Sequence, residues 1–331
     1  MNLKSIFVSL GLAATFSLNA AQAAETDLVV KFVDVGAGLC VLSKGPESQM
    51  VYDAGHWDGQ QCLKAARSFF DKSEPIDLMV LSHSDGDHIG DAAEILNEFE
   101  VSKILRTGHE RETGAWKDMA AALKQENGIE DINLARTPLQ PGERFILGDA
   151  TAYFVAGWHD WTETSLNEGE DRNAISIVIR LEYGGTAVLL TGDTIGRRLN
   201  DPDDACKDAE AWMVKNQPQL LDADVLQAPH HGGNNGSSSC FIKAVSPQWV
   251  VFSAGHKHDH PTYGAADRYM AAGVKRQNML RTDRGDDEGG YEWEYLSADT
   301  CKDESGDDSV TLVISEQGEV QIAYDTPYQG C

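Results

Sequence analysis

The sequence predicts an α/β fold in one large domain, and three observations support this prediction. Short apolar runs typical of strands alternate with amphipathic patterns typical of helices, and the second half of the 331 residues repeats the alternation of the first. The composition is that of an ordinary globular protein, with 41% hydrophobic and 24% charged residues. The sequence contains no stretch of linker-like composition, so we predict that residues 24–331 form a single domain.

The first 23 residues have the pattern of a signal peptide. Lys4 gives a positively charged start, and Ile6–Leu18 forms an apolar core that is too short to span a bilayer. Ala21-Gln22-Ala23 then places small residues where a signal peptidase would cut. An uncleaved membrane anchor is the alternative interpretation. We therefore expect an exported protein, periplasmic or extracellular, whose mature part 24–331 contains no membrane span.

In the first half of the mature chain, strand-like runs alternate with helical patterns. The segment Gln60–Phe70 is predicted to be a helix because Leu63, Ala66, Phe69 and Phe70 fall on one side of it. The other predicted elements are strands at Leu28–Val35, Leu39–Leu42, Gln49–Tyr52, Leu78–Ser82 and Val101–Arg106, helices at Ile89–Phe99 and Gly114–Gln125, short strands between Ile132 and Val155, and a long surface loop at Trp158–Arg172.

The second half begins with two strong strands, Ala174–Glu182 and Thr186–Leu190, which Gly184-Gly185 joins as a hairpin. A Gly- and Ser-rich loop follows at His231–Ser239. We interpret the late acidic loops as solvated, with calcium binding as the alternative. The remaining predicted elements are helices at Ala209–Asn216, Cys240–Val245 and Tyr263–Ala272, and strands at Ala223–Gln227, Trp249–Phe252, Tyr291–Leu296, Val310–Ile314 and Val320–Tyr324.

The charge balance excludes one class of function. The chain has 27 Lys+Arg against 53 Asp+Glu, a net charge of −26. A protein with this balance does not bind nucleic acid or anionic membrane through a general basic surface. Metal ions can still supply positive charge locally. We therefore expect a small-molecule substrate and disfavour polymeric nucleic acid as a partner, without excluding it.

Six cysteines, an even number in a chain predicted to be exported, indicate up to three disulfides. A cysteine metal site is not indicated, because no two cysteines have the spacing of a CxxC ligand pair. Sequence alone leaves the pairing open. Pairing neighbours along the chain, we predict Cys40–Cys62, Cys206–Cys240 and Cys301–Cys331.

The strongest chemical signal is a cluster of four potential metal ligands. His83, Asp85, Asp87 and His88 follow an apolar strand directly and precede a predicted helix. Gly86 permits the tight bend that lets these side chains converge. The alternative is a polar loop that caps the helix, but capping requires one such side chain and not four. Histidine mixed with carboxylate suits zinc, manganese or iron better than calcium or magnesium.

Further metal ligands are expected where other strands end. Asp193 follows the strand Thr186–Leu190, His230 and His231 follow Ala223–Gln227, and His260 follows Trp249–Phe252. Each signal is weak alone. Together they place acidic and imidazole side chains at the carboxyl ends of strands, which is the usual edge for an α/β active site.

These motifs resemble those of the metallo-β-lactamase-fold hydrolases. The loop 83–88 matches their signature in its carboxylate form, His-x-Asp-x-Asp-His. The greatest likeness is to the branch that contains the nuclease-like domain of bacterial DNA-uptake channels and the choline-phosphate esterases. The resemblance implies a four-layer αββα sandwich with metals at one edge of two packed sheets. Its motifs are Phe32-Val33-Asp34-Val35-Gly36-x-Gly38, Tyr52-Asp53-Ala54-Gly55, Asn173-x-x-Ser176, Leu190-Thr191-Gly192-Asp193, Pro229-His230-His231-Gly232 and His260-Pro261.

The resemblance also implies ligands for two divalent metal ions, zinc or alternatively manganese. His83 and Asp85 would bind the first ion, Asp87 and His88 would bind the second, and Asp193 would bridge both.

The surrounding residues receive roles from the same resemblance. His231, in preference to His230, would complete the second metal site. Asp53 would orient a ligand histidine through a hydrogen bond. Asn173 stands where zinc-type relatives have a third histidine, so the first site would be short of nitrogen ligands.

The function implied is hydrolysis of a phosphoester, of the phosphodiesterase type, by a hydroxide that bridges the two metals. Asp87 and Asp193 would hold the metals, His230 would contact the phosphoryl oxygen, and His260 is the candidate proton donor to the leaving group. Two alternatives remain. The same site could hydrolyse a lactone, a thioester or a β-lactam, or the protein could be a non-catalytic binding module that its metals stabilise.

Overall fold

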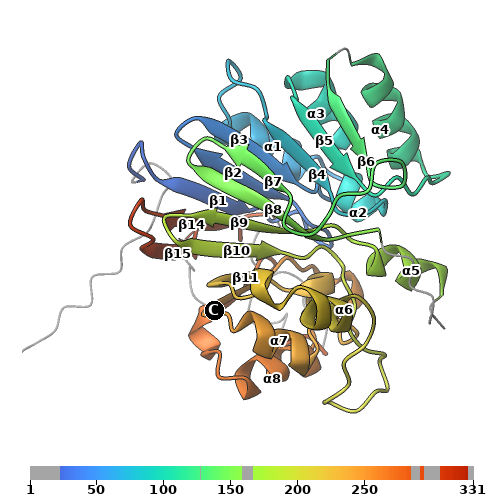
Figure 1. Ribbon diagram of the computed structural model, residues 1–331, viewed down its shortest axis with the longest axis vertical. Coiled ribbons are helices and arrows are strands. Elements are labelled where there is room, and N and C mark those ends of the chain that lie inside the picture. The colour runs from blue at the N-terminus through green and yellow to red at the C-terminus, as the bar shows by residue number, and fades with distance from the viewer. Residues whose placement is uncertain (1–22, 127, 159–166, 285–290, 294–305, 327–331) are drawn as a thin grey trace, which may run out of the picture.

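The computed structural model describes residues 23–126, 128–158, 167–284, 291–293 and 306–326. Two sheets lie face to face, and helices cover the outer face of each sheet (Figure 1). The order of the layers is therefore helix, sheet, sheet, helix. This arrangement confirms the αββα sandwich that the sequence motifs predict.

The first sheet has eight strands among the described residues, in the order β15-β14-β1-β2-β3-β4-β5-β6. Neighbours from β15 to β3 pair antiparallel, whereas β3 to β6 pair parallel. Parallel pairs need crossover connections, which pass through helices on the outer face. The strands are β1 Leu28–Phe32, β2 Val41–Gly45, β3 Ser48–Tyr52, β4 Leu78–Leu81, β5 Lys103–Arg106, β6 Glu130–Asn133, β14 Val310–Ile314 and β15 Val320–Tyr324.

The second sheet has seven strands in the described part of the chain, in the order β13-β12-β11-β10-β9-β8-β7. Strands β7 to β10 pair antiparallel, and β10 to β13 pair parallel. Both sheets thus end in a run of parallel strands. The strands are β7 Arg144–Leu147, β8 Ala150–Ala156, β9 Val178–Tyr183, β10 Thr186–Leu190, β11 Val225–Gln227, β12 Trp249–Phe252 and β13 Met279–Arg281.

The helices lie on the two outer faces of the sandwich and near its edge. Helices α1, α3 and α4 pack on the first sheet, and α6, α7 and α8 pack on the second (Figure 1). Within the described ranges, none is both long and apolar enough to cross a bilayer. The helices are α1 Gln61–Phe69, α2 Gly86–Ile89, α3 Ala92–Glu98, α4 Gly114–Gln125, α5 Glu168–Ala174, α6 Asp208–Asn216, α7 Ser239–Val245 and α8 Tyr263–Ala271, with short 3₁₀ turns at Pro218–Leu220, Pro229–Gly232, His256–His258 and Arg276–Asn278.

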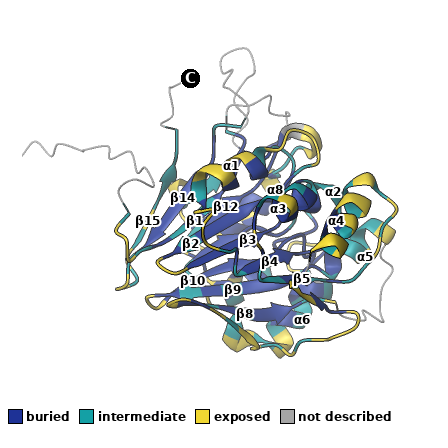
Figure 2. Cartoon of the chain, turned by 90° about the horizontal axis from the view of Figure 1, so that it is seen from above, coloured by how far each residue is buried: buried dark blue, intermediate teal, exposed yellow. Residues whose placement is uncertain are grey.

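The core follows from the alternation of side chains along each strand. In β10 every residue is buried, because one face of the strand packs between the sheets and the other packs under helices. Val188 and Leu190 belong to the cluster between the sheets, and Ala187 and Leu189 belong to the cluster under α6, α7 and α8. Figure 2 shows these buried strands between helices whose outer faces are exposed.

Four sequence predictions differ from the structure. The predicted helix Ile89–Phe99 is two helices, α2 and α3, which separate at Asp91, where φ of −94° and ψ of 10° depart from helical values. The predicted loop Trp158–Arg172 contains the start of α5, which a capping box formed by Asn167 and Glu170 begins. Strand β13 was not predicted, and the predicted strand Ala174–Glu182 begins only at Val178, because Ala174 is the last residue of α5. Most of the predicted strand Tyr291–Leu296 lies outside the described residues.

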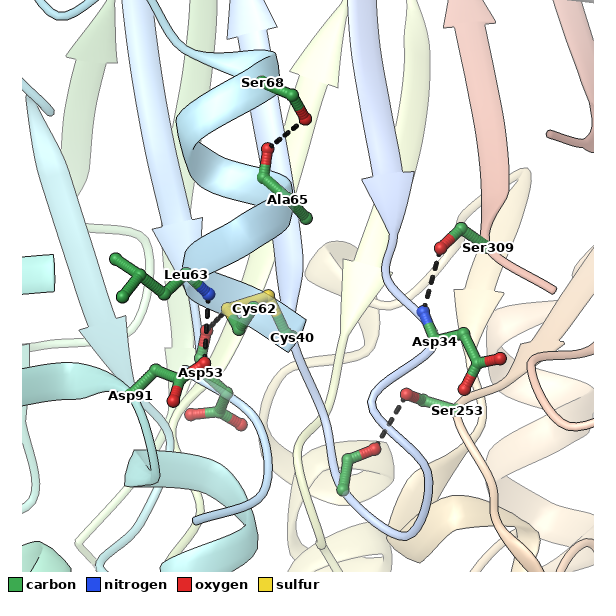
Figure 3. Close-up of a disulfide and its surroundings, with 11 residues drawn as sticks. Asp34, Cys40, Asp53, Cys62, Leu63, Ala65, Ser68, Asp91, Ser253 and Ser309 are labelled. Atoms are coloured by element: carbon green, nitrogen blue, oxygen red, sulfur yellow. Dashed lines mark hydrogen bonds between the residues drawn. A yellow bond between two sulfur atoms is a disulfide. The ribbon is translucent and has the colours of Figure 1, made fainter. Parts of the chain in front are cut away.

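Two of the three predicted disulfides are present. Cys40 pairs with Cys62 and Cys206 pairs with Cys240, whereas the predicted Cys301–Cys331 pair lies outside the described residues. Figure 3 shows the first disulfide between the start of α1 and the chain that enters β2. The sulfur of Cys62 lies 3.8 Å from the carbonyl oxygen of Asp53. This disulfide therefore braces the backbone at the end of β3, where the site begins.

Candidate metal centre

The predicted site residues meet at the edge where the two sheets come together. Strands β3 and β4 are parallel, so Asp53 and His83 leave the first sheet at the same end. Strands β10, β11 and β12 are also parallel, which brings the residues that follow them to one end of the second sheet. A cavity of about 560 Å³ opens there, with walls that include Asp85, Asp87, Asn173, Asp193, His230, His231 and His260.

Gly192 allows the two sheets to approach each other at this edge. Its φ of 54° lies in the left-handed region, and a Cβ there would lie 2.8 Å from the side chain of Ser82. The following residue, Asp193, donates its backbone N–H to Ser176 Oγ at 3.1 Å. The turn at Gly192 therefore places the carboxylate of Asp193, which follows a strand of the second sheet, beside the loop that follows β4 in the first sheet.

His88 is fully buried, and its hydrogen bonds fix which nitrogen faces the cavity. Its Nδ1 lies 2.7 Å from Oδ2 of Asp53. Ser82 donates from both its backbone N–H and its hydroxyl to the same carboxylate, each at 2.6 Å. A carboxylate only accepts hydrogen bonds, so Nδ1 of His88 carries the proton and Nε2 presents a lone pair to the site.

His231 is oriented in the same way from the second sheet. Its Nδ1 donates to the carbonyl oxygen of Ser253 at 2.6 Å, so its Nε2 also presents a lone pair. The two Nε2 atoms of His88 and His231 face each other at 3.2 Å. Oδ1 of Asp193 lies 3.2 Å and 3.3 Å from these nitrogens. Three lone-pair-bearing atoms this close repel one another unless protons or a metal ion lie among them, and their types fit a metal ion.

The charges of these groups depend on one another. Burial disfavours the charged form of His88, but Asp193 and Asp53 outweigh burial and raise its pKa well above the ordinary value. Burial opposes ionisation of Asp193, yet the neighbouring His231, His88 and His230 hold its pKa well below the usual range. Protons and metal ions therefore compete for the same lone pairs, and binding of a metal would release protons.

Potential ligand atoms gather in two groups. His83, His88 and Asp193 form one, and Asp87, His88 and His231 form the other, with all ligand atoms in each group within 4.8 Å of one another. Nε2 of His83 is buried and has no hydrogen-bond partner in the described part of the chain. Five of the six predicted ligands thus lie together, and the two groups have His88 in common.

Asp85, the sixth predicted ligand, belongs to neither group. Its carboxylate accepts hydrogen bonds from Arg111 and from Arg172, the latter at 2.6 Å from Nε. Its distance to Nε2 of His83 is 3.9 Å. Two guanidinium groups therefore compete with a metal for this carboxylate, because the guanidinium groups and the metal would bind the same oxygens.

His230 and Asn173 pair with each other at the cavity wall. The amide of Asn173 donates to Nε2 of His230 at 3.1 Å, and Nδ1 of His230 donates to Oδ1 of Asn235 at 2.6 Å. Both ring nitrogens of His230 are therefore engaged, whereas Nε2 of His231 is free for a metal. The buried Oδ1 of Asn173 has no hydrogen-bond partner among the described residues.

His260 lies beside these histidines but in an environment that keeps it neutral. Burial, followed by the proximity of His230, His231 and His258, lowers its pKa to about 2. An imidazole with this pKa holds no extra proton near neutral pH. These surroundings favour the neutral form of His260, and its role as proton donor to the leaving group stays a prediction.

The backbone is strained at three residues of the site. Asp53, His230 and His231 have φ values of 58°, 51° and 55°, in the left-handed region that side chains other than glycine rarely adopt. Each such residue costs on the order of 1 kcal/mol or more, and such strain gathers at functional sites. Here the strain turns two consecutive histidines and the orienting carboxylate toward one cavity.

Glu210 supports the loop that carries His231, and it yields a prediction about pH. It is fully buried and accepts hydrogen bonds from the backbone N–H groups of Ser237 and Ser238, each at 2.7 Å. Burial raises its pKa to about 7, above the value of 4.5 for the unperturbed group. Its contribution to stability is therefore full below about pH 4.5 and is lost as the pH rises through 7.

We expect this loss to vanish in Glu210→Gln, which cannot ionise. The free energy of unfolding of the native protein minus that of the variant should fall by about 3 kcal/mol between pH 4 and pH 9. Urea unfolding across this pH range measures the difference. A difference that stays constant with pH would contradict the raised pKa.

Several residues of the site were not found from the sequence. Each contacts a site residue that lies 5 to 87 positions away in the sequence, and nothing in its local sequence marks it. These residues are Arg111, Arg172, Asn235 and Ser253. Asn235 had one available signal, since it lies in the Gly- and Ser-rich loop directly after the two histidines.

Comparison with known proteins assigns the family. The model of the metallo-beta-lactamase superfamily matches residues 33–256, more than half of the chain. The chain therefore belongs to the metallo-β-lactamase superfamily. The matched range contains the donor residues from Asp53 to His231 and the strands that carry them.

The curated relatives include competence proteins, the branch that the motifs resemble. The chain is 28% identical over 261 residues to "Competence protein ComA" of Neisseria gonorrhoeae, covering 78% of this chain and 31% of that protein. It is 25% identical over 212 residues to "ComE operon protein 3" of Bacillus subtilis, covering 63% of this chain and 24% of that protein. The chain thus spans a third or less of the length of these relatives.

Solved structures that match this chain include the metallo-beta-lactamase fold protein YhfI of Bacillus subtilis. It has a TM-score of 0.48 and 13% sequence identity, over 77% of this chain and 96% of that chain. The metallo hydrolase Igni18 of Ignicoccus hospitalis has a TM-score of 0.46 and 19% identity, over 75% of this chain and 93% of that chain.

Proposed function

We propose that this protein is an exported, metal-dependent hydrolase of phosphoesters. The observation that carries the proposal is the convergence of Nε2 of His88, Nε2 of His231 and Oδ1 of Asp193 within 3.3 Å, with both imidazole protons committed elsewhere. Two disulfides are compatible with the export part of the proposal.

The residues would divide the work between two divalent ions, for which zinc and manganese both suit the donors. Asp87, His88 and His231 would hold one ion, His83 and Asp85 would hold the other, and Asp193 would bridge them. Asp53 keeps His88 in the tautomer that a metal requires. When bound, such ions lower the pKa of water and offset negative charge on a phosphoryl group.

The charges around the cavity favour an anionic substrate. In a chain with a net charge of −26, the cavity walls and the adjoining surface include Lys257, Arg111 and Arg172. Asn173 lines the cavity, and the second N–H of its amide would donate to a phosphoryl oxygen. His230 lines the cavity beside it, and its Nε2 holds that amide in place. His260, held neutral, would orient the leaving group without charging it.

A three-substrate assay tests the proposal. Protein loaded with zinc or manganese is offered bis-p-nitrophenyl phosphate, a lactone and a chromogenic cephalosporin. We expect turnover of the phosphodiester, lost in Asp87→Ala and retained in Asp131→Ala, an exposed carboxylate on strand β6. Turnover of only the lactone or the cephalosporin would overturn the proposal. Inactivity toward all three by a metal-loaded sample would favour a non-catalytic module.

A further inference from the structure

We propose that Arg111 and Arg172 form a subsite for a second phosphate group of the substrate, beside the metal centre. The inference rests on the proposed phosphoester function and names its substrate class, a phosphodiester that carries another phosphate on the same molecule. A second cavity of about 420 Å³ contains both guanidinium groups. Trp57, Asp85 and Asp87 line this cavity and the metal cavity alike, so the two are contiguous.

The two arginines of the second cavity share one partner, the carboxylate of Asp85. Asp87 also lines this cavity, but within the described residues no ion pair joins it to either arginine, and its carboxylate lies 3.8 Å from Nε2 of His231. Glu168 offers Arg172 a contact of 3.4 Å, but its side chain is 89% exposed and water screens it. The proposed metal ions would draw on Asp85 and Asp87, which would leave the two guanidinium groups available to an anion.

Arg111 keeps donors available for such an anion. It reaches Asp85 through Nη1 alone, and its other N–H groups meet no acceptor among the described residues. Its side chain is 22% exposed, so the guanidinium is held in place yet open to the cavity. A planar guanidinium with free N–H groups suits the oxygens of a phosphate, which it binds by charge-assisted hydrogen bonds.

The N-terminal end of α4 adds to the positive electrostatic potential of the second cavity. Gly114 and Ala115, in the first turn of this 12-residue helix, line the cavity. The first turn contains no acidic side chain, and the hydroxyl of Thr113 is buried without a hydrogen-bond partner in the described part of the chain. A helix N-terminus favours an anion, so this end complements the two arginines.

Trp57 stands between the two cavities and would lie against the part of the substrate that joins its phosphates. Its side chain is 55% exposed, and a Cβ at Gly86 would lie 2.9 Å from the indole ring. The indole thus rests on the loop that carries Asp85 and Asp87. A flat, fixed ring between two anion sites suits a ring-bearing linker such as a nucleoside.

A pair of matched substrates tests the subsite. The p-nitrophenyl ester of thymidine 5′-phosphate is compared with the same compound bearing an additional 3′-phosphate. We expect the native protein to prefer the 3′-phosphorylated compound by about tenfold in kcat/KM, and Arg111→Gln to reduce that ratio to about one. Arg67→Gln, an exposed arginine on α1, is the control and should keep the preference.

Equal loss of kcat/KM on both compounds in Arg111→Gln, with the ratio unchanged, would assign Arg111 only to holding Asp85 and would overturn the subsite. A native protein without a preference would overturn it as well. Calorimetric titration of thymidine 3′,5′-bisphosphate into the purified protein gives a readout independent of turnover. We expect Kd to rise about tenfold in Arg111→Gln. If neither ester is hydrolysed but this rise is observed, the phosphoester function fails and the anion subsite stands.

Discussion

Replacing Asp193 by asparagine is expected to remove bound metal and phosphodiester turnover together. The substitution keeps the shape of the side chain but removes the charge that lies 3.2 Å from His88 and 3.3 Å from His231. Because the carboxylate oxygens of Asp193 lie within 4.0 Å of Nε2 of His83, His88 and His231, their loss should weaken metal binding by more than about 100-fold, beyond what loss of an outer partner costs. Metal content and kcat/KM of the same preparation measure the two effects.

The exposed carboxylate Asp222 provides the control for this experiment. Asp222→Asn lies at the far end of the second sheet, before β11, and should leave both quantities unchanged. Asp193→Asn that retains its full metal content would refute the bridging role. Thermal unfolding in the presence of a chelator, which removes metal from both proteins, distinguishes loss of metal from loss of fold. Under these conditions only a misfolded variant should have a lower melting temperature than the native protein.

Replacing Asp53 by alanine is expected to have the second largest effect, although Asp53 need not touch a metal. Its two oxygens accept hydrogen bonds from His88 and from two groups of Ser82, all of them buried. Removing the carboxylate leaves these donors without an acceptor and frees the ring of His88 to rotate. We expect metal affinity to fall about 10- to 100-fold and the free energy of unfolding to fall by about 3 kcal/mol or more.

The asparagine variant distinguishes orientation from general stability. Asn accepts one hydrogen bond through Oδ1 and tolerates the left-handed φ of 58° better than alanine does. We therefore expect Asp53→Asn to recover most of the stability that Asp53→Ala loses, but only part of the metal affinity. If both variants bound zinc as the native protein does, the orienting role of Asp53 would be wrong.

The metal ligands of the site could be predicted because each follows an apolar strand and is a histidine or an aspartate, residue types that bind metals. His83, Asp87 and His88 follow β4, and Asp193 follows β10, so strand recognition and side-chain chemistry together located them. Glycine constraints that arise only in three dimensions could not be predicted. Gly90 lies so near the backbone of His56 that a Cβ there would be only 2.4 Å away, and this approach joins segments that are distant in the sequence.

The electrostatic surroundings of the site escaped prediction for a related reason. Asp85 was assigned to a metal from its position in the motif, but its arginine partners lie 26 and 87 residues away in the sequence. The neutral state of His260 likewise depends on histidines that reach it from separate segments. A motif specifies residue types along the chain, whereas these effects depend on which segments pack together.

Anomalous X-ray scattering from a crystal of the purified, metal-supplemented protein tests the central claim most directly. Data collected on both sides of the zinc and manganese absorption edges locate and identify a bound ion without reference to activity. We expect a strong peak among Nε2 of His88, Nε2 of His231 and the carboxylate of Asp193, with a second and weaker peak beside His83. A map without a peak at these atoms, or with its peaks elsewhere, would contradict it.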